Sequence, residues 1–393
     1  MDFTIPDELQ ALRASFRSFL DREIRPLDEE LREEFWSGTP DHGRRYEAAQ
    51  EVKRRSVAQG FYAPYMPESV GGEGLSALGT ALLVEDAARS GLRMAMVAIA
   101  PPNPAGPSTM LLDLPEHLWD TYLRPVVSGE KSMCFALTEP EAGSDAQAIR
   151  TRARREGDEW VIDGHKHYIT NAEHADFAVI FAVTDPEKRA AGGITAFVVP
   201  RAQFRSGKTQ WTIADTHPAE IFLEGARVPA DHVIGEVGLG FFAAMRFLNA
   251  GRAYIAAQCL GLAEFALDAA IEHANARTAF GKPLGKQQGV SFPLAQSKVD
   301  IEAMRWLTYQ LAWQVDTTEA SQAGALMLDS SIVKYHNTER AYAVADRCLQ
   351  VFGGMGLLRE GPVERVLRHL RMLRVVEGAS EVQLLVVSRA MGL

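Results

Sequence analysis

The 393-residue sequence has few cysteines, no excess of basic residues and no long apolar runs. Its three cysteines, Cys134, Cys259 and Cys348, are far apart and form no CxxC pair. This argues against a disulfide framework or a thiolate zinc site and favours a reducing, cytoplasmic setting. The net charge of −10 disfavours nucleic acid as the main partner. No run approaches about 18 apolar residues, so we expect no membrane span. The first six residues lack the basic and apolar blocks of a secretory signal, so none is expected.

The remaining composition is that of a globular protein, with 47% apolar and 23% charged residues. A chain of this length exceeds one ordinary core, so two or three domains are expected. Apolar residues recur at helical spacing in the N-terminal third, where Pro26 should interrupt or end the first helix. The helices expected there cover residues 6–36, 46–59, 78–90 and 118–127.

The pattern changes between about residues 133 and 230, where segments are short, rich in β-branched residues and separated by turns. Such spacing predicts a small antiparallel β-domain. Long helical patterns then return and are long enough to pack as a bundle. These helices are expected over residues 241–276, 290–315, 321–352 and 362–391. We therefore predict an α+β multidomain chain with a helical domain (1–130), a β-domain (131–236) and a four-helix bundle (237–393).

Two segments imitate nucleotide-binding motifs without the required context. Gly72–Ala77 matches GxGxxA, but it follows Pro67-Glu68-Ser69 rather than a strand. Ser206–Thr209 resembles the end of a P-loop, but Ala202 occupies the position of the first glycine. Neither segment is expected to bind a nucleotide.

Histidines concentrate in one predicted strand, where His165 and His167 would share a face and His174 lies nearby. A metal site needs more ligands in register. We therefore interpret these residues as ordinary histidines on a sheet surface and predict no metal site.

Two segments stand out for their chemistry. Phe135–Asp145 predicts a strand that runs into a Gly/Ser/Pro turn, whose N–H and hydroxyl groups either form an ordinary turn or hold a heterocycle and a pyrophosphate. Far downstream, Val376–Glu381 offers one carboxylate, Glu377, beside apolar residues and a glycine. Burial can raise the pKa of such a carboxylate toward neutrality, and Gly378 allows a ligand to approach the backbone closely.

In combination these segments resemble the acyl-CoA dehydrogenase family, and the resemblance covers nearly the whole chain. Matching motifs occur in the same order as in the family. They are Gly164–Ala172 (G-x-K-x-aromatic-I-[ST]-N), Leu248–Arg252 (L-D-x-x-R), Arg277–Gln288 (R-x-x-F-G-x-x-L-x-x-x-Q) and Gln350–Gly354 (Q-x-x-G-G). The resemblance implies a barrel-like central β-domain between helical domains, with FAD as cofactor and an acyl-CoA thioester as substrate.

The resemblance also implies which residues hold FAD. Arg277, Phe280 and Gly353 correspond to residues that serve the FAD of a neighbouring subunit, so a homo-oligomer is expected, as a dimer of dimers. The predicted FAD-binding residues are Phe135, Leu137, Thr138, Gly143, Ser144, Tyr168, Ile169, Thr170, Arg277, Phe280, Gln288, Gln350, Gly353, Gly354, Ala379 and Glu381.

By the same resemblance Glu377 is the base that removes the α-proton of the thioester, and its backbone N–H stabilises the thioester oxygen. Some relatives carry the base on an earlier helix, but the matching residue here is Gly251, which cannot serve. The structural alternative is that Glu377 only pairs with Arg371 or Arg374. The predicted substrate-binding residues are Ser144, Asn249, Arg252 and Gly378, with Asn249 standing where the family has Asp.

Several alternatives remain open from sequence. Electrons pass to an electron-transfer flavoprotein or similar acceptor in a dehydrogenase, or to oxygen in an acyl-CoA oxidase. A catalytically silent flavin-binding relative is a third possibility, and a nitroalkane oxidase relative would be expected to use Asp as its base. Val376 and Ala379 replace the Tyr and Thr of many relatives, and the segment 204–220 is shorter than usual. These departures affect the predicted substrate pocket, and the acyl chain length is not predicted.

Overall fold

The structure is a computed structural model that describes residues 4–32, 42–102, 106–319 and 324–393. The chain divides into two compact units, each assembled from separate stretches of sequence. The first unit comprises Met1–Pro64, Leu75–Ile99 and Asn249–Leu393, and the second comprises Tyr65–Gly74 and Ala100–Leu248. The three domains expected from sequence stay a prediction.

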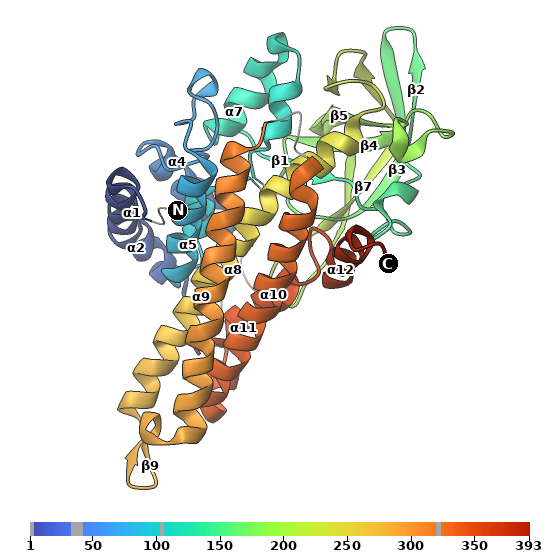
Figure 1. Ribbon diagram of the computed structural model, residues 1–393. Helices are drawn as coiled ribbons and strands as arrows, with labels where there is room; N and C mark the ends of the chain where they lie inside the picture. Colours follow the sequence, from blue (N-terminus) through green and yellow to red (C-terminus); the bar gives the residue numbers. More distant parts are fainter. Residues whose placement is uncertain (1–3, 33–41, 103–105, 320–323) are drawn as a thin grey trace. The chain divides into compact units, whose positions relative to one another are not determined.

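The first unit is helical (Figure 1). Its helices are α1 (Asp7–Phe19), α2 (Arg25–Glu30), α4 (His42–Val57), α5 (Ala77–Arg89), α6 (Ala95–Ile99), α8 (Gly240–Ala276, which begins in the second unit), α9 (Gln288–Thr317), α10 (Leu326–Val351), α11 (Glu364–Leu373) and α12 (Ser380–Ala390). The short strands β9 (Thr278–Ala279) and β10 (Lys282–Pro283) form a hairpin between α8 and α9.

The N-terminal helical pattern is followed closely, with one local change. A π-helical turn, Leu20–Ile24, joins α1 to α2. Pro26 lies in the first turn of α2, where a missing backbone N–H costs little. The expected interruption at Pro26 therefore takes the form of a π turn followed by a new helix start, and residues 33–36 lie outside the described residues.

The long helices α8, α9 and α10 run side by side and bury a shared core (Figure 1). The most apolar window of α8 is long and apolar enough to cross a membrane, but 72% of that window is buried inside the protein. Ala256, Ala263, Cys259 and Leu260 in the middle of α8 are fully buried, so α8 is the central helix of a packed core. The C-terminus of α9 also caps α5, since Asp316 accepts hydrogen bonds from the N–H groups of Ala77 and Leu78.

The single helix predicted over residues 362–391 is wrong. The structure has two helices there, α11 and α12, separated by a turn at residues 374–379. Apolar periodicity alone continues across the break, whereas left-handed backbone at Glu377 and Gly378 ends the helix.

The second unit is built on a sheet whose strands follow the order β6-β7-β3-β2-β4-β5-β8, with β1 beside β4. Its strands are β1 (Met133–Ala136), β2 (Arg152–Glu156), β3 (Glu159–Ile169), β4 (Phe177–Val183), β5 (Ile194–Pro200), β6 (Arg205–Thr209), β7 (Ala219–Pro229) and β8 (Val233–Ile234), and a short helix α7 (Arg124–Val127) precedes them.

The predicted fold class, with helical segments before and after a central β-domain in the chain, is confirmed. Two details of the antiparallel, barrel-like β-domain differ in the structure. The described strands form a mixed sheet, because β4 pairs in parallel with β1 and with the start of β2. Their order does not close into a barrel, since the end strands β6 and β8 do not pair with each other. Between β1 and β4 the chain forms the β2–β3 hairpin, a connection long enough to let two strands enter the sheet in the same direction. Alternation of apolar residues identifies strands but not their partners.

The two segments that imitate nucleotide-binding motifs, at residues 72–77 and 206–209, lack the structural context of those motifs, as the sequence suggested. Glu68–Val70 is a 3₁₀ turn rather than a strand. Ser206–Thr209 lies within β6 and does not lead into a helix. Neither segment has the strand–loop–helix arrangement that holds a phosphate.

Candidate active site

Glu377 lies in the turn that separates α11 from α12. Its backbone is left-handed with φ of 55°, and Gly378 follows with φ of 98°. Left-handed backbone at a residue with a side chain costs free energy, so surrounding contacts must hold it in place. Such strain is concentrated at functional sites more than elsewhere.

The contacts that hold this turn converge on Gly378. Its carbonyl oxygen accepts hydrogen bonds from Lys334 Nζ of α10 at 2.7 Å and from Gln383 Nε2 of α12 at 2.8 Å. A Cβ at Gly378 would lie 2.5 Å from Gln383 Nε2, so both the backbone angle and the space require glycine. The N–H of Ser380 closes the turn by donating to the carbonyl of Arg374 at 3.0 Å.

Burial raises the pKa of the Glu377 carboxyl to about 7, because the surrounding protein disfavours its charged form. The positive charges of Lys334 and Arg252 oppose this effect but do not cancel it. Burial likewise lowers the pKa of Lys334, whose side chain is fully buried, to about 8. A carboxyl group with a pKa near 7 is suited to accept a proton at neutral pH.

The contacts do not support the alternative in which Glu377 only forms an ion pair with Arg371 or Arg374. Arg374 is engaged by Glu339, with Nη2–Oε2 at 2.7 Å and Nε–Oε1 at 2.8 Å, and it lies over the ring of Tyr342. Within the described residues Glu377 forms no ion pair with Arg371 or Arg374. Its electrostatic partners are Lys334 and Arg252.

Arg252 lies on α8 and is almost fully buried. Its Nη1 donates to Asn249 Oδ1 at 2.9 Å and to the hydroxyls of Ser330 and Ser331 at 3.2 Å each. All three acceptors are neutral, so none of them offsets the charge of Arg252, and burial lowers its pKa to about 10. A carboxylate at position 249 would neutralise the charge of Arg252. Because this position is Asn, the positive charge of Arg252 still acts on Glu377.

The predicted flavin-facing turn in the second unit is anchored by a buried ion pair. Lys166 of β3 is fully buried and donates to Glu139 Oε1 at 2.8 Å and to the carbonyl of Leu137 at 3.1 Å. The Glu139 carboxylate also accepts hydrogen bonds from the backbone N–H groups of Arg150 and Thr151. Together with the charge of Lys166, these hydrogen bonds hold the pKa of Glu139 below its usual range. The turn is thereby fixed while Gly143 and Ser144 at its tip are exposed.

The end of β3 presents the second predicted flavin segment. Tyr168 has φ of 57° and its ring is largely exposed, whereas Ile169 is buried and Thr170 is exposed. Asn171 Nδ2 donates to the carbonyl of Met133 in β1 at 2.9 Å. This bond ties the end of β3 to β1, so the structure brings the two predicted flavin segments together in one unit. Phe135 and Leu137 are buried beside them.

The other predicted FAD residues lie on the surface of the first unit. Phe280, at φ of 52° in the tip of the β9–β10 hairpin, is almost fully exposed, and Gly353 follows α10 with φ of 57°. Exposed side chains and open glycine backbones are what a partner-facing cofactor site requires. Arg277, Gln288, Gln350, Gly354 and Glu381 are also exposed, while Ala379 is partly buried at the start of α12.

Strained backbone coincides with the predicted site. Eight non-glycine residues in the described part of the chain have positive φ, and three of them, Tyr168, Phe280 and Glu377, are predicted cofactor or catalytic residues. Sequence reasoning selected them from motifs alone, so the strain is an independent indication of function.

A cavity of about 410 Å³ in the first unit is not part of this site. Its walls carry opposite charges that already pair, since Arg305 contacts Glu264 through Nη2 at 2.6 Å and Glu85 through Nη1 at 3.0 Å. We interpret it as a structural ion-pair network.

Sequence reasoning missed two residues, Lys166 and Lys334. Each is a fully buried lysine that donates to the backbone carbonyl of a predicted site residue, Leu137 for Lys166 and Gly378 for Lys334. No apolar pattern marked either residue, because Lys166 lies between two histidines and the helical neighbours of Lys334 include Ser331 and Asn337. Both lysines read as ordinary exposed charges, since lysine is rarely buried without a partner.

Comparison with known proteins gives matches to three family models in chain order. They are described as the N-terminal (residues 6–130), middle (134–225) and C-terminal (238–392) domains of acyl-CoA dehydrogenase.

Two curated relatives are similar over nearly the whole chain. One is the mitochondrial short-chain specific acyl-CoA dehydrogenase of Homo sapiens, 36% identical over 388 residues, or 98% of this chain and 90% of the relative. The other is a 3-(aryl)acrylate reductase of Clostridium sporogenes, 33% identical over 99% of each chain. Among solved structures, butyryl-CoA dehydrogenase from Megasphaera elsdenii superposes with a TM-score of 0.85 and 32% identity over 100% of both chains.

Proposed function

Since this chain belongs to the acyl-CoA dehydrogenase family of FAD-dependent oxidoreductases, we propose that it converts an acyl-CoA thioester to the trans-2-enoyl-CoA with Glu377 as the base. The observation that carries the proposal is the strained turn at Glu377, where burial raises the pKa of the carboxyl to about 7. No other part of the family machinery supplies a base here, because Gly251 has no side chain.

In the proposed mechanism Glu377 accepts the α-proton of the thioester. The charges of Lys334 and Arg252 keep a useful fraction of the carboxyl deprotonated at neutral pH. As negative charge develops on the thioester oxygen, the backbone N–H of Glu377 stabilises it. That N–H makes no backbone hydrogen bond within the described residues, so it is free for this role.

When bound, FAD would supply the acceptor for the hydride that leaves the β-carbon. The residues proposed to hold it suit a planar cofactor with a pyrophosphate. The turn at Gly143 and Ser144 is exposed and a Cβ at Gly143 would meet nothing within 4 Å. The Tyr168 ring projects from a strained position at the end of β3 and Thr170 offers a hydroxyl beside it.

A second candidate function is the reverse reaction, the reduction of a 2-enoyl thioester. The relative from Clostridium sporogenes is by name a reductase of 3-(aryl)acrylates, so it adds hydrogen across a bond of the same kind. The residues described here serve both directions, because Glu377 in its protonated form can return a proton to the α-carbon.

Anaerobic titration of the FAD-loaded protein with a panel of acyl-CoAs tests the proposal. Straight-chain, branched and aryl-substituted thioesters should be compared, and at least one should bleach the oxidised flavin and yield the 2-enoyl-CoA. In air, turnover should require an electron-transfer flavoprotein or similar acceptor, whereas peroxide formation without one would indicate an oxidase. Failure of every acyl-CoA to bleach bound FAD would favour a non-catalytic relative.

The face of α9 supports assembly with a second copy of this chain. Phe292, Val299, Trp306 and Trp313 recur at every seventh residue and are between 47% and 63% exposed. A stripe of large apolar side chains at this spacing is typical of a helix that packs against another helix. Together with the exposed Arg277 and Phe280, it supports a homo-oligomer in which one copy completes the FAD site of another.

Two substitutions separate assembly from cofactor binding. Val299→Glu should dissociate the oligomer and lower FAD retention together, because it places a charge in the stripe. Arg277→Ala should lower FAD retention without dissociation, as it removes a charge-assisted contact of ~1.5–3 kcal/mol. Light scattering gives the mass, and chromatography after denaturation should release FAD and not FMN. A monomeric wild type that retains FAD would contradict the proposal.

A further inference from the structure

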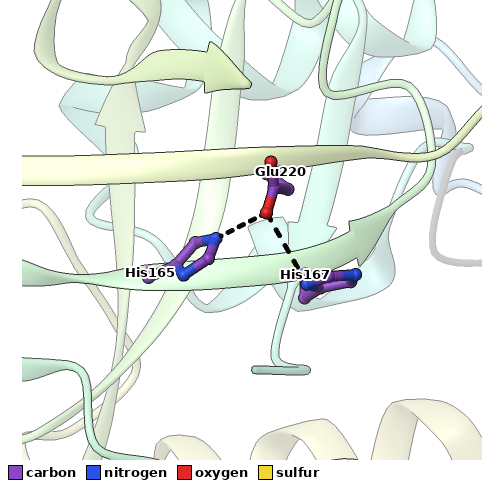
Figure 2. A group of neighbouring side chains, drawn as sticks. All are labelled: His165, His167 and Glu220. Atoms are coloured by element: carbon purple, nitrogen blue, oxygen red, sulfur yellow. Dashed lines mark hydrogen bonds and ion pairs between the residues drawn. The ribbon is translucent and has the colours of Figure 1, made fainter. Parts of the chain in front are cut away.

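Two histidines and a glutamate from neighbouring strands face one another in the second unit (Figure 2). His165 and His167 belong to β3, and Glu220 belongs to β7. Glu220 Oε1 lies 3.0 Å from His165 Nε2 and 3.8 Å from His167 Nδ1. One ligand atom from each residue lies within 4.8 Å of the others, and within the described part of the chain no other trio of His, Cys, Asp or Glu is grouped in this way.

The sheet register explains the grouping. β3 and β7 are antiparallel, with His165 opposite Phe222 and Lys166 opposite Ile221. Because side chains alternate, Lys166 and Ile221 point into the core, where both are fully buried, and the histidines and Glu220 share the other face. The sequence could not show Glu220 as a third ligand, since a register shift follows Lys166 and the pairing of β7 with β3 is not evident from spacing.

Neighbouring side chains hold each imidazole. The ring of His165 stacks on Phe222 with centroids 4.3 Å apart and an interplanar angle of 15°, and Arg205 lies on Phe222 at 4.3 Å. Gln210 Nε2 lies 2.9 Å from His167 Nε2. All three members of the trio are only partly exposed, so their rotamers are limited before any ion binds.

Two buried polar atoms at this place have no partner. They are His167 Nδ1, which faces Glu220 beyond hydrogen-bond distance, and Gln210 Oε1. Rotating the Gln210 amide by half a turn lets Oε1 accept a hydrogen bond from the N–H of His167 Nε2. The lone pair of His167 Nδ1 then points to the group formed with His165 and Glu220. A cation there would give His167 Nδ1 the partner that it lacks.

The spacing suits a tetrahedral ion. Ligand atoms about 2.1 Å from one zinc ion lie about 3.4 Å from each other at tetrahedral angles, and the two observed separations from Glu220, 3.0 and 3.8 Å, bracket that distance. We propose that His165, His167 and Glu220 bind one zinc-class divalent cation, with water in the fourth position. Two imidazoles and a carboxylate are a ligand set that Zn²⁺ accepts.

The bound ion would cross-link β3 to β7 where their register shifts. The ring of His167 contacts that of Tyr168, with centroids 4.0 Å apart, so the same ion would stiffen the strand end that carries Tyr168. Binding requires unprotonated imidazoles, and affinity should therefore fall as pH is lowered.

Calorimetric titration of the untagged, FAD-loaded protein with Zn²⁺ after chelator treatment tests the site. The wild type should bind one ion per chain. His165→Ala, His167→Ala and Glu220→Gln should each weaken binding at least ~10-fold, and Gln210→Leu should weaken it ~10–100-fold through the orientation of His167. The matched control is His117→Ala, which removes an exposed histidine paired with only one carboxylate, Asp231, and should bind as the wild type does.

Thermal melting and FAD content check that each variant is folded. Zinc should raise the melting temperature of the wild type and of His117→Ala, but not of the three ligand variants. Anomalous diffraction at the zinc edge should give one peak among the three side chains. Equal affinity in the folded ligand variants, or no binding by the wild type, would overturn the proposal.

Discussion

Replacing Glu377 with Gln should slow reduction of bound FAD by an acyl-CoA by about 10²–10⁴-fold, the usual contribution of a positioned base. The loss can be larger, because the alternative base position is occupied by Gly251. Gln keeps the size of the side chain and an acceptor oxygen but cannot take up the α-proton. Acyl-CoA should still bind, as its recognition is distributed over other residues. Anaerobic stopped-flow bleaching of the flavin measures the effect.

The matched control for this variant is Glu360→Gln, which makes the same chemical change at an exposed carboxylate of the same unit. An acyl-CoA should reduce the FAD bound to this variant at the wild-type rate. Glu377→Asp retains a base on a shorter side chain and should fall between the two. If Glu377→Gln bleached the flavin as fast as Glu360→Gln, the base would lie elsewhere.

Lys334→Met should lower the rate of FAD reduction at pH 7 by about 10–100-fold. Two physical effects combine in this loss. The Gly378 carbonyl keeps only Gln383 as its donor, so the turn that positions Glu377 loosens. The carboxyl of Glu377 also loses a nearby positive charge, so its pKa should rise from about 7.

The sign of the pH dependence follows from that shift. Glu377 is a base only when deprotonated, so the wild-type rate should rise with pH through about 7. In Lys334→Met the rise should move to higher pH, and part of the lost rate should return when the pH is raised. A purely structural defect would lower the rate equally at every pH.

The control for Lys334 is Lys298→Met, which removes an exposed lysine that pairs with Glu302 on the surface of α9. Its rate and pH profile should match those of the wild type. A folded Lys334→Met protein with a wild-type profile would show that Lys334 neither positions Glu377 nor tunes its pKa.

Much of the fold could be predicted because its signals are local. Apolar periodicity located α1, α5, α8, α9 and α10, and short β-branched segments between turns located the sheet. Glu377 could be selected because a carboxylate beside a glycine fits both a family motif and the chemistry of proton removal. The family assignment from these motifs is confirmed by matches along the whole chain.

The features that sequence did not predict depend on long-range contacts. The break between α11 and α12 is stabilised by Lys334, which lies 44 residues before Gly378 in the chain, and apolar periodicity does not reflect such a contact. The parallel pairing of β1 with β4 and the approach of Glu220 to His165 also depend on which strands become neighbours. From the sequence, Asn249 indicates only the loss of the negative charge that the family has at this position. In the structure its side-chain oxygen accepts a hydrogen bond from Arg252.

One measurement tests the central claim most directly, namely a single anaerobic turnover of the FAD-loaded wild type with its best acyl-CoA labelled with deuterium at C2. We expect one 2-enoyl-CoA for each FAD reduced, slower reduction with the labelled substrate, and deuterium lost from C2. These results would follow from removal of the α-proton by Glu377 together with hydride loss from the β-carbon. Flavin reduction without 2-enoyl-CoA, or at a rate indifferent to the C2 label, would contradict the account.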